Sequence, residues 1–170
     1  MSRRDLIHNW LVYALAMLPV WLLDAYILPR FPVWGVSPML LPSAVAVVAV
    51  LEGSFAGTGF GLGVGLLWEL AYPGGFGGLV IGMAAIGRIS GSLAQFVLSQ
   101  SLAGGLFCSA LSLLLLDGLR MLRALFTDFA PMSALLQVAV PEILLSLLWA
   151  LPIWFLFQAV YRRVGGEKLA

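Results

Sequence analysis

Four ionisable side chains interrupt stretches of the sequence that are otherwise apolar. Ionised groups are expensive to place in hydrocarbon, and in membrane helices they usually face a protein interior or an aqueous cavity. Three roles fit such groups: structural pairing or contact with interfacial water, a path for a proton or substrate, and contact with a partner. The four residues are Asp24, Glu69, Arg88 and Asp117.

Glu69 and Arg88 are the two that could pair with each other. Glu69 lies near the end of one apolar stretch and Arg88 about half-way through the next. If these stretches form a helical hairpin, an inward-facing ion pair is possible, although the two depths do not obviously match. Asp24 and Asp117 lie near the ends of their stretches, where we expect them to reach interfacial water.

Glycine occupies every second position in one apolar stretch. On a helix this spacing gives two series of small residues four apart, which let helix backbones approach closely and drive helix association in lipid. The series serve either packing within the chain or a groove for a partner helix. No phosphate-binding Lys or Ser/Thr follows, so a nucleotide loop is not indicated. The two series are Gly57, Gly61 and Gly65, and Gly59 and Gly63.

The sequence offers no constellation of catalytic residues. No serine or cysteine has a plausible base beside it, and no two carboxylates are placed for acid–base chemistry. Cys108 lies in an apolar run, as a small packing residue does. His8 has no second ligand nearby. We therefore expect a protein that is not an enzyme and that has no cofactor and no metal site.

Composition indicates lipid as the solvent. Of 170 residues, 62% are hydrophobic and 10% are charged, whereas about a quarter of residues are charged in soluble domains. The mean hydropathy is +1.04, and too few polar side chains exist to cover a soluble globule. The net charge of +1 argues against a nucleic-acid surface. We expect residues 1–170 to form a single all-α integral membrane domain.

Apolar runs separated by Pro, Gly and polar residues predict about six transmembrane helices, some shorter than the usual length of about 20 residues. Spans two and three could instead form one re-entrant hairpin. In the sixth span, Pro141 and Pro152 predict a kink or a later start. The expected spans are 10–28, 38–51, 56–71, 79–98, 103–122 and 135–161.

Basic residues near the span ends predict the orientation. With six spans both termini share one side, and the side richer in Lys and Arg is cytoplasmic. The count of five against three favours cytoplasmic termini. The five are Arg3, Arg4, Arg162, Arg163 and Lys168, and the three are Arg30, Arg120 and Arg123.

The middle of the chain resembles the MreD family of bacterial rod shape-determining membrane proteins. The segment Pro38-Met39-Leu40-Leu41-Pro42 matches the proline-led second span typical of that family. A glycine-rich segment G-x-G-F-x-x-G-L-L-x-D typically follows, and Glu69 stands where an Asp is more usual. A glycine turn corresponds to 74–78. The residues near that pattern are Gly57, Gly59, Phe60, Gly63, Leu66 and Leu67.

The resemblance implies a non-enzymatic scaffold subunit of the cell-elongation complex in the bacterial cytoplasmic (inner) membrane. MreD-like proteins bind MreC, a single-span protein, and belong to a complex with MreB, the RodA glycan polymerase and its class B transpeptidase partner. Such a subunit helps to control cell shape and peptidoglycan synthesis. The implied fold is a six-helix bundle similar to the substrate-binding components of energy-coupling-factor vitamin transporters. Membrane lipid is an expected contact and nucleic acid is not.

Two other functions are open. A substrate-binding transporter component would have the same size and span count, with a cavity lined by Glu69, Arg88 and tryptophans. However, the Ala-x-x-x-Ala pattern usual in its first span is missing, since Ala14, Ala16 and Ala25 are spaced differently. A membrane enzyme acting on lipid-linked precursors would need more polar residues converging near one interface than the sequence offers.

Overall fold

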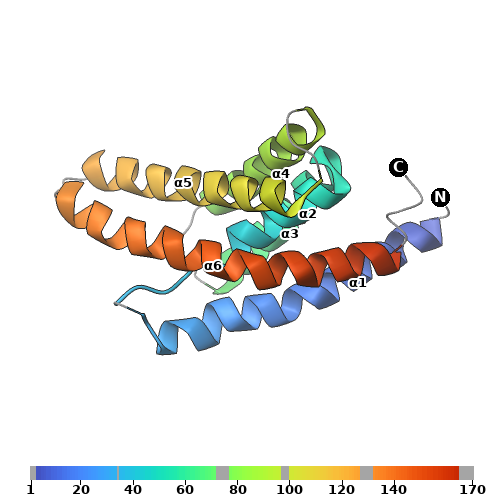
Figure 1. Cartoon of the computed structure of the whole chain (residues 1–170), viewed down its shortest axis with the longest axis horizontal. Helices are drawn as coiled ribbons and strands as arrows, with labels where there is room; N and C mark the ends of the chain where they lie inside the picture. The colour runs from blue at the N-terminus through green and yellow to red at the C-terminus, as the bar shows by residue number, and fades with distance from the viewer. Residues whose placement is uncertain (1–2, 34, 72–76, 97–99, 127–131, 165–170) are drawn as a thin grey trace.

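The computed structural model describes residues 3–33, 35–71, 77–96, 100–126 and 132–164 (Figure 1). Within these ranges the chain is helical, apart from short connections and one isolated β-bridge between Val33 and Val36. The all-α prediction is confirmed. The helices are α1 (Arg3–Leu22), which continues as a π-helical turn (Leu23–Ile27) and a 3₁₀ turn (Leu28–Arg30), α2 (Leu41–Glu52), α3 (Ser54–Ala71), α4 (Gly78–Phe96), α5 (Leu102–Phe126) and α6 (Met132–Val164).

Four helical segments in the described part of the chain are long and apolar enough to cross a membrane. This number is smaller than the six spans that the sequence predicts. The clearest difference is α2, whose 12 residues extend about 18 Å at 1.5 Å per residue, short of a hydrocarbon core about 30 Å thick. The chain has the character of a multi-pass helical membrane protein. The four segments are His8–Arg30, Gly78–Phe96, Leu102–Leu122 and Leu136–Val164.

The short helix α2 forms the centre of the bundle. Every residue from Leu41 to Leu51 is buried. A helix that is apolar on all sides is shielded from water by protein or by lipid, and α2 is shielded by protein, because it packs against each of the other five helices, with α1 the least involved. The core of the protein is therefore built around the shortest of its six α-helices.

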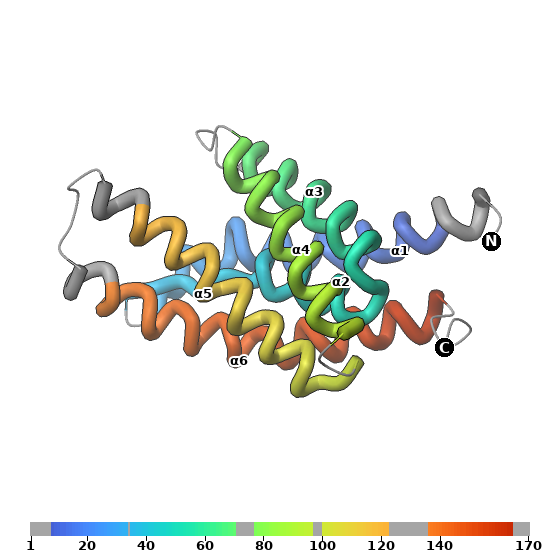
Figure 2. The backbone as a smooth tube through the Cα atoms, turned by 90° about the horizontal axis from the view of Figure 1, so that it is seen from above, coloured from blue at the N-terminus to red at the C-terminus, as the bar shows by residue number. Residues whose placement is uncertain are grey.

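Glycines with positive φ directly precede both α3 and α4. Gly53, at φ 93°, is the single residue between α2 and α3, and Gly77, at φ 75°, directly precedes α4. L-residues with side chains rarely adopt this conformation, so glycine fits both positions, and Gly53 permits the sharp reversal from α2 to α3. Helices α3 and α4 then run side by side as an antiparallel hairpin (Figure 2).

Contacts along the bundle show that successive helices alternate in direction. Near one end of α2, Leu40 bonds to Asp24 of the π-helical turn, and at its other end Glu52 accepts a hydrogen bond from Tyr13 of α1. Helix α1 is therefore antiparallel to α2. Helices α5 and α6 form a second long hairpin, and the start of α1 lies at the same end of the molecule as the end of α6 (Figure 1).

Proline affects the first and last helices differently. The prolines at 29 and 32 coincide with the end of the first helix at Arg30, as the loss of backbone donors predicts. Pro141 and Pro152 instead lie inside α6, which is continuous from Met132 to Val164. The prediction of a later start for the sixth helix is wrong, because α6 begins before residue 135.

Candidate functional site

A cluster of charged side chains lies inside the bundle at the start of α2. Asp24 comes from the π-helical turn after α1, Asp117 and Arg120 from α5, and Glu142 from α6. The three carboxyl residues are each less than a tenth exposed. Three distant parts of the sequence thus bring ionisable groups to one place, which we call the polar cluster.

Asp24 caps α2 from another helix. The backbone N–H of Leu40 donates to its Oδ1 atom at 2.6 Å. The first N–H groups of a helix have no partner within that helix, and the helix dipole favours a negative group there. The wider π-helical turn from Leu23 to Ile27 carries Asp24, and turns of this type occur frequently at functional sites.

Arg120 is the only basic member of the polar cluster. Its Nη1 atom lies 3.7 Å from Asp117 Oδ1 and 3.6 Å from Glu142 Oε1, and its guanidinium group lies 5.9 Å from the centre of the Trp68 ring. The arginine side chain is 44% exposed, in contrast to the two acids. It therefore joins α3, α5 and α6 while its outer part reaches the surface.

The extended segment before α2 is tied to α6 as well as to α1. The N–H of Met39 donates to Ser146 Oγ at 2.8 Å, and that hydroxyl donates to the carbonyl of Glu142 at 2.6 Å. Backbone groups buried at this depth need such partners, because water is not available to them. The polar cluster thus holds the start of the central helix in place.

A cavity of about 340 Å³ opens beside the polar cluster. Its wall carries two carboxyl groups, one guanidinium group and an indole, so it combines charged groups with an aromatic surface. Its volume lies at the lower end of the range for sites that bind small molecules. The lining residues are Asp24, Pro29, Ser37, Pro38, Met39, Trp68, Arg120 and Glu142.

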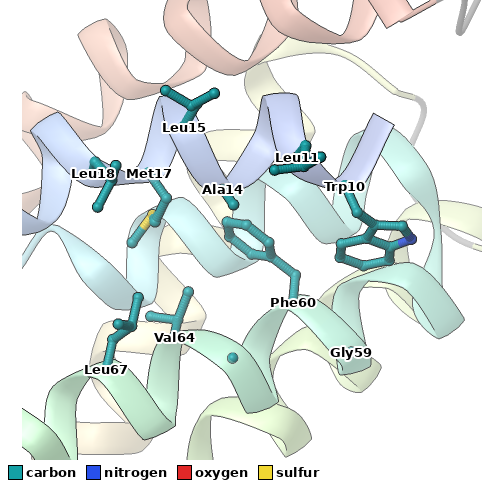
Figure 3. A pocket seen from close by; sticks show the side chains of 11 residues that line it. Trp10, Leu11, Ala14, Leu15, Met17, Leu18, Gly59, Phe60, Val64 and Leu67 are labelled. Atoms are coloured by element: carbon teal, nitrogen blue, oxygen red, sulfur yellow. The ribbon is translucent and has the colours of Figure 1, made fainter. Parts of the chain in front are cut away.

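A second hollow is almost entirely apolar. It is a groove of about 410 Å³ between α1 and α3 (Figure 3). Gly59 and Gly63 form part of its floor, and both glycines are exposed. A Cβ atom added at Gly63 would have no neighbour within 4 Å. The residues that line this groove, which we call the α1–α3 groove, are Trp10, Leu11, Ala14, Leu15, Met17, Leu18, Gly59, Phe60, Gly63, Val64 and Leu67.

The other glycine series faces the inside of the hairpin. A Cβ atom on Gly61 would overlap with the carbonyl group of Met83, and one on Gly65 would lie 2.6 Å from the Cα atom of Val80. Gly57 is equally confined, between Ala49 of α2 and Gly87 of α4. Gly57, Gly61 and Gly65 therefore allow α3 to pack backbone against backbone with α4, which leaves no room there for another protein.

The predicted pair between Glu69 and Arg88 does not form. Gly57 packs against Gly87, so Arg88 lies level with the start of α3. Glu69 is twelve residues further along α3, about 18 Å away at 1.5 Å per residue. Glu69 has a buried Oε1 atom without a hydrogen-bond partner, and Arg88 is exposed. Neither residue lines the polar cavity. Of the residue types expected to line such a cavity, a tryptophan is present, Trp68.

The other two predicted ionisable residues, Asp24 and Asp117, are buried and belong to the polar cluster. Arg120 and Glu142 are members that the sequence reasoning missed. Arg120 was counted among the residues flanking a span, and Glu142 was not singled out as a candidate. A usable signal existed: Asp117 and Glu142 lie at similar distances from the connection between α5 and α6, so a hairpin places them opposite each other.

Comparisons with protein-family models, with curated proteins and with solved structures find no match for this chain. A functional proposal therefore rests on the geometry of the α1–α3 groove and the polar cluster, and on the sequence motif between residues 38 and 78.

Proposed function

We propose that this protein is a non-enzymatic membrane scaffold of the MreD type, which holds the membrane helix of an MreC-like single-span protein. The observation that carries the proposal is the α1–α3 groove, where Gly59 and Gly63 lie exposed on an apolar surface. Small residues four apart allow a second helix to approach closely. The groove thus supplies what the motif resemblance requires, a place for a partner helix.

The proposed topology has six passes, with both termini in the cytoplasm. The alternating directions of the six helices support it, as does the common end shared by the start of α1 and the end of α6. The short α2 fits this topology because the polar cavity and the extended segment before Leu41 occupy the remaining depth. The membrane would be the bacterial cytoplasmic membrane.

The mechanism would be helix docking without chemistry at the site. The partner helix would lie across Gly59 and Gly63, with its side chains against Leu11, Leu15 and Leu67. In lipid the favourable binding free energy comes from close van der Waals packing of the two helices and not from removal of apolar surface from water. Holding MreC in this way would help to place the elongation machinery, including MreB, a RodA-like polymerase and a class B transpeptidase.

The experiment that tests the proposal is purification of the tagged chain from its own membranes in mild detergent, followed by quantitative mass spectrometry. Gly63→Leu would fill the groove, and Gly118→Leu is its matched control, because a Cβ atom at either glycine meets nothing within 4 Å. We expect a single-span, MreC-like protein with the wild type and with Gly118→Leu, and its loss with Gly63→Leu. Recovery of that partner in equal amounts from both variants would remove the groove from the mechanism.

The polar cavity supports a second candidate function, the substrate-binding component of a vitamin transporter. A cavity of about 340 Å³ lined by Trp68, Arg120 and two carboxyl groups can hold a small polar molecule. The test is native mass spectrometry of the purified protein. A bound small molecule that disappears in Arg120→Gln, together with a co-purified ATPase pair, would favour the transporter. A protein without such a molecule and with an MreC-like partner would exclude it.

A further inference from the structure

The outward face of α4 carries a basic residue in the middle of a membrane span. The inward face of α4 is made by buried residues such as Met83, Ile86 and Ala94, which pack into the bundle. On the opposite face Arg88 is exposed, and so are Ile81 and Phe96, at 72% and 85%. No ion pair involving Arg88 is found among the described residues. An arginine among exposed apolar side chains requires an explanation.

The depth of Arg88 argues against a simple interfacial role. It lies ten residues after Gly78 and eight before Phe96, the two ends of this candidate span. At 1.5 Å per residue these distances are about 15 Å and 12 Å. Arginines near the ends of membrane helices extend their charge to the lipid headgroups, whereas a central one usually faces protein or water and has a charged partner.

The residues around Arg88 are suited to contact with another helix. Ala85 and Ser92 lie one turn before and after it, and a side chain of either kind lets a second backbone come close. Ser92 satisfies its own hydroxyl by donating to the Arg88 carbonyl at 2.8 Å. The guanidinium group is thus the one charged group that this part of the face presents to a neighbour.

We propose that this face of α4 docks a membrane helix of another protein that carries an aspartate or glutamate at the depth of Arg88. A carboxylate is the complementary charge, and it accepts two parallel hydrogen bonds from a guanidinium group. A second copy of this chain is disfavoured, because a two-fold contact would place Arg88 against Arg88. Helix α4 contributes no residue to the α1–α3 groove, so the proposal does not depend on the proposed scaffold function.

Site-specific photo-crosslinking in native membranes tests the proposal. A photoreactive phenylalanine at Ala85 or at Ser92 is expected to give an adduct with a membrane segment that contains Asp or Glu, identified by sequencing the linked peptide. Arg88→Gln should reduce the yield about tenfold, which corresponds to about 1.4 kcal/mol. Arg88→Lys should keep a large part of it. Reversing the charges, with Arg88→Asp and Arg in place of the partner's acid, should restore the adduct.

Two controls separate docking from folding. Because Arg88 pairs with no described residue, Arg88→Gln should leave the thermal unfolding temperature of the purified chain unchanged. The same photoreactive residue at Leu114, exposed on α5, should give adducts that do not depend on Arg88. Adducts with lipid alone, with a second copy of this chain, or with a segment lacking an acid would each overturn the proposal, as would a yield unaffected by Arg88→Gln.

Discussion

Glycine has opposite roles on the two faces of α3. Gly61 lies against the backbone of α4 with no space for even one more carbon atom, whereas Gly63, two residues later, opens onto the α1–α3 groove with nothing near it. Residues two apart on a helix point about 200° apart, so alternating glycines separate into two series. The series with Gly61 packs α3 against α4, and the series with Gly63 lines the open α1–α3 groove.

The largest effect is expected from Gly61→Leu on the inner face. The new side chain would have to displace the Met83 carbonyl, and backbone cannot move away as a side chain can. We expect a loss of about 3 kcal/mol or more in the free energy of unfolding, measured by thermal unfolding in detergent. A variant as stable as the wild type would show that α3 and α4 are not in backbone contact at Gly61.

Asp24→Ala is expected to cause the next largest loss of stability, since Asp24 holds the start of the buried helix α2. It removes the acceptor for the Leu40 N–H at the start of α2. A buried donor left without a partner costs about 1–3 kcal/mol. Asp24→Asn keeps an oxygen and should recover part of this loss in the same unfolding measurement. Equal stability of the two variants would mean that the cap does not hold α2.

Gly65→Ala adds a single methyl group to the inner face. That group would lie 2.6 Å from the Cα atom of Val80, so the helices must separate slightly. We expect a cost of about 1–2 kcal/mol, smaller than that of leucine at Gly61. A rise in unfolding temperature, as the better helix propensity of alanine alone would give, would contradict the close packing inferred at this point.

On the outer face, Gly63→Leu should change stability least. Its side chain meets open space, and leucine is a better helix former than glycine. We therefore expect an unfolding temperature equal to or slightly above that of the wild type, and similar behaviour from Gly118→Leu. A marked loss of stability with Gly63→Leu alone would indicate that α1 closes onto α3 and that the groove is part of the fold.

The positions of the helices follow from the sequence for a simple reason. Apolar runs are long in lipid-exposed helices, and Pro29, Gly53 and Gly77 lie where the chain turns. The burial of α2 on all sides could not be predicted from its composition, because a short apolar helix has the same composition whether it faces lipid or protein. Its length of 12 residues was the available sign that this helix alone is too short to span the hydrocarbon core.

Two members of the polar cluster were singled out from the sequence, but the cluster itself was not predicted, because pairing depends on register. The depths of Glu69 and Arg88 did not obviously match, and the contact between Gly57 and Gly87 places them far apart. Asp24 and Asp117 were found from their type and surroundings alone. Arg120 and Glu142 required the α5–α6 hairpin to be aligned, since their role follows from the residues opposite them rather than from their own neighbours.

The central claim is that a partner helix occupies the α1–α3 groove, and a cryo-electron microscopy structure of the complex purified from its own membranes tests it most directly. The account predicts one additional helix that crosses α3 at Gly59 and Gly63 and contacts Leu11 and Leu15 of α1. A complex in which the groove contains only lipid, while the single-span partner lies against another helix, would contradict it.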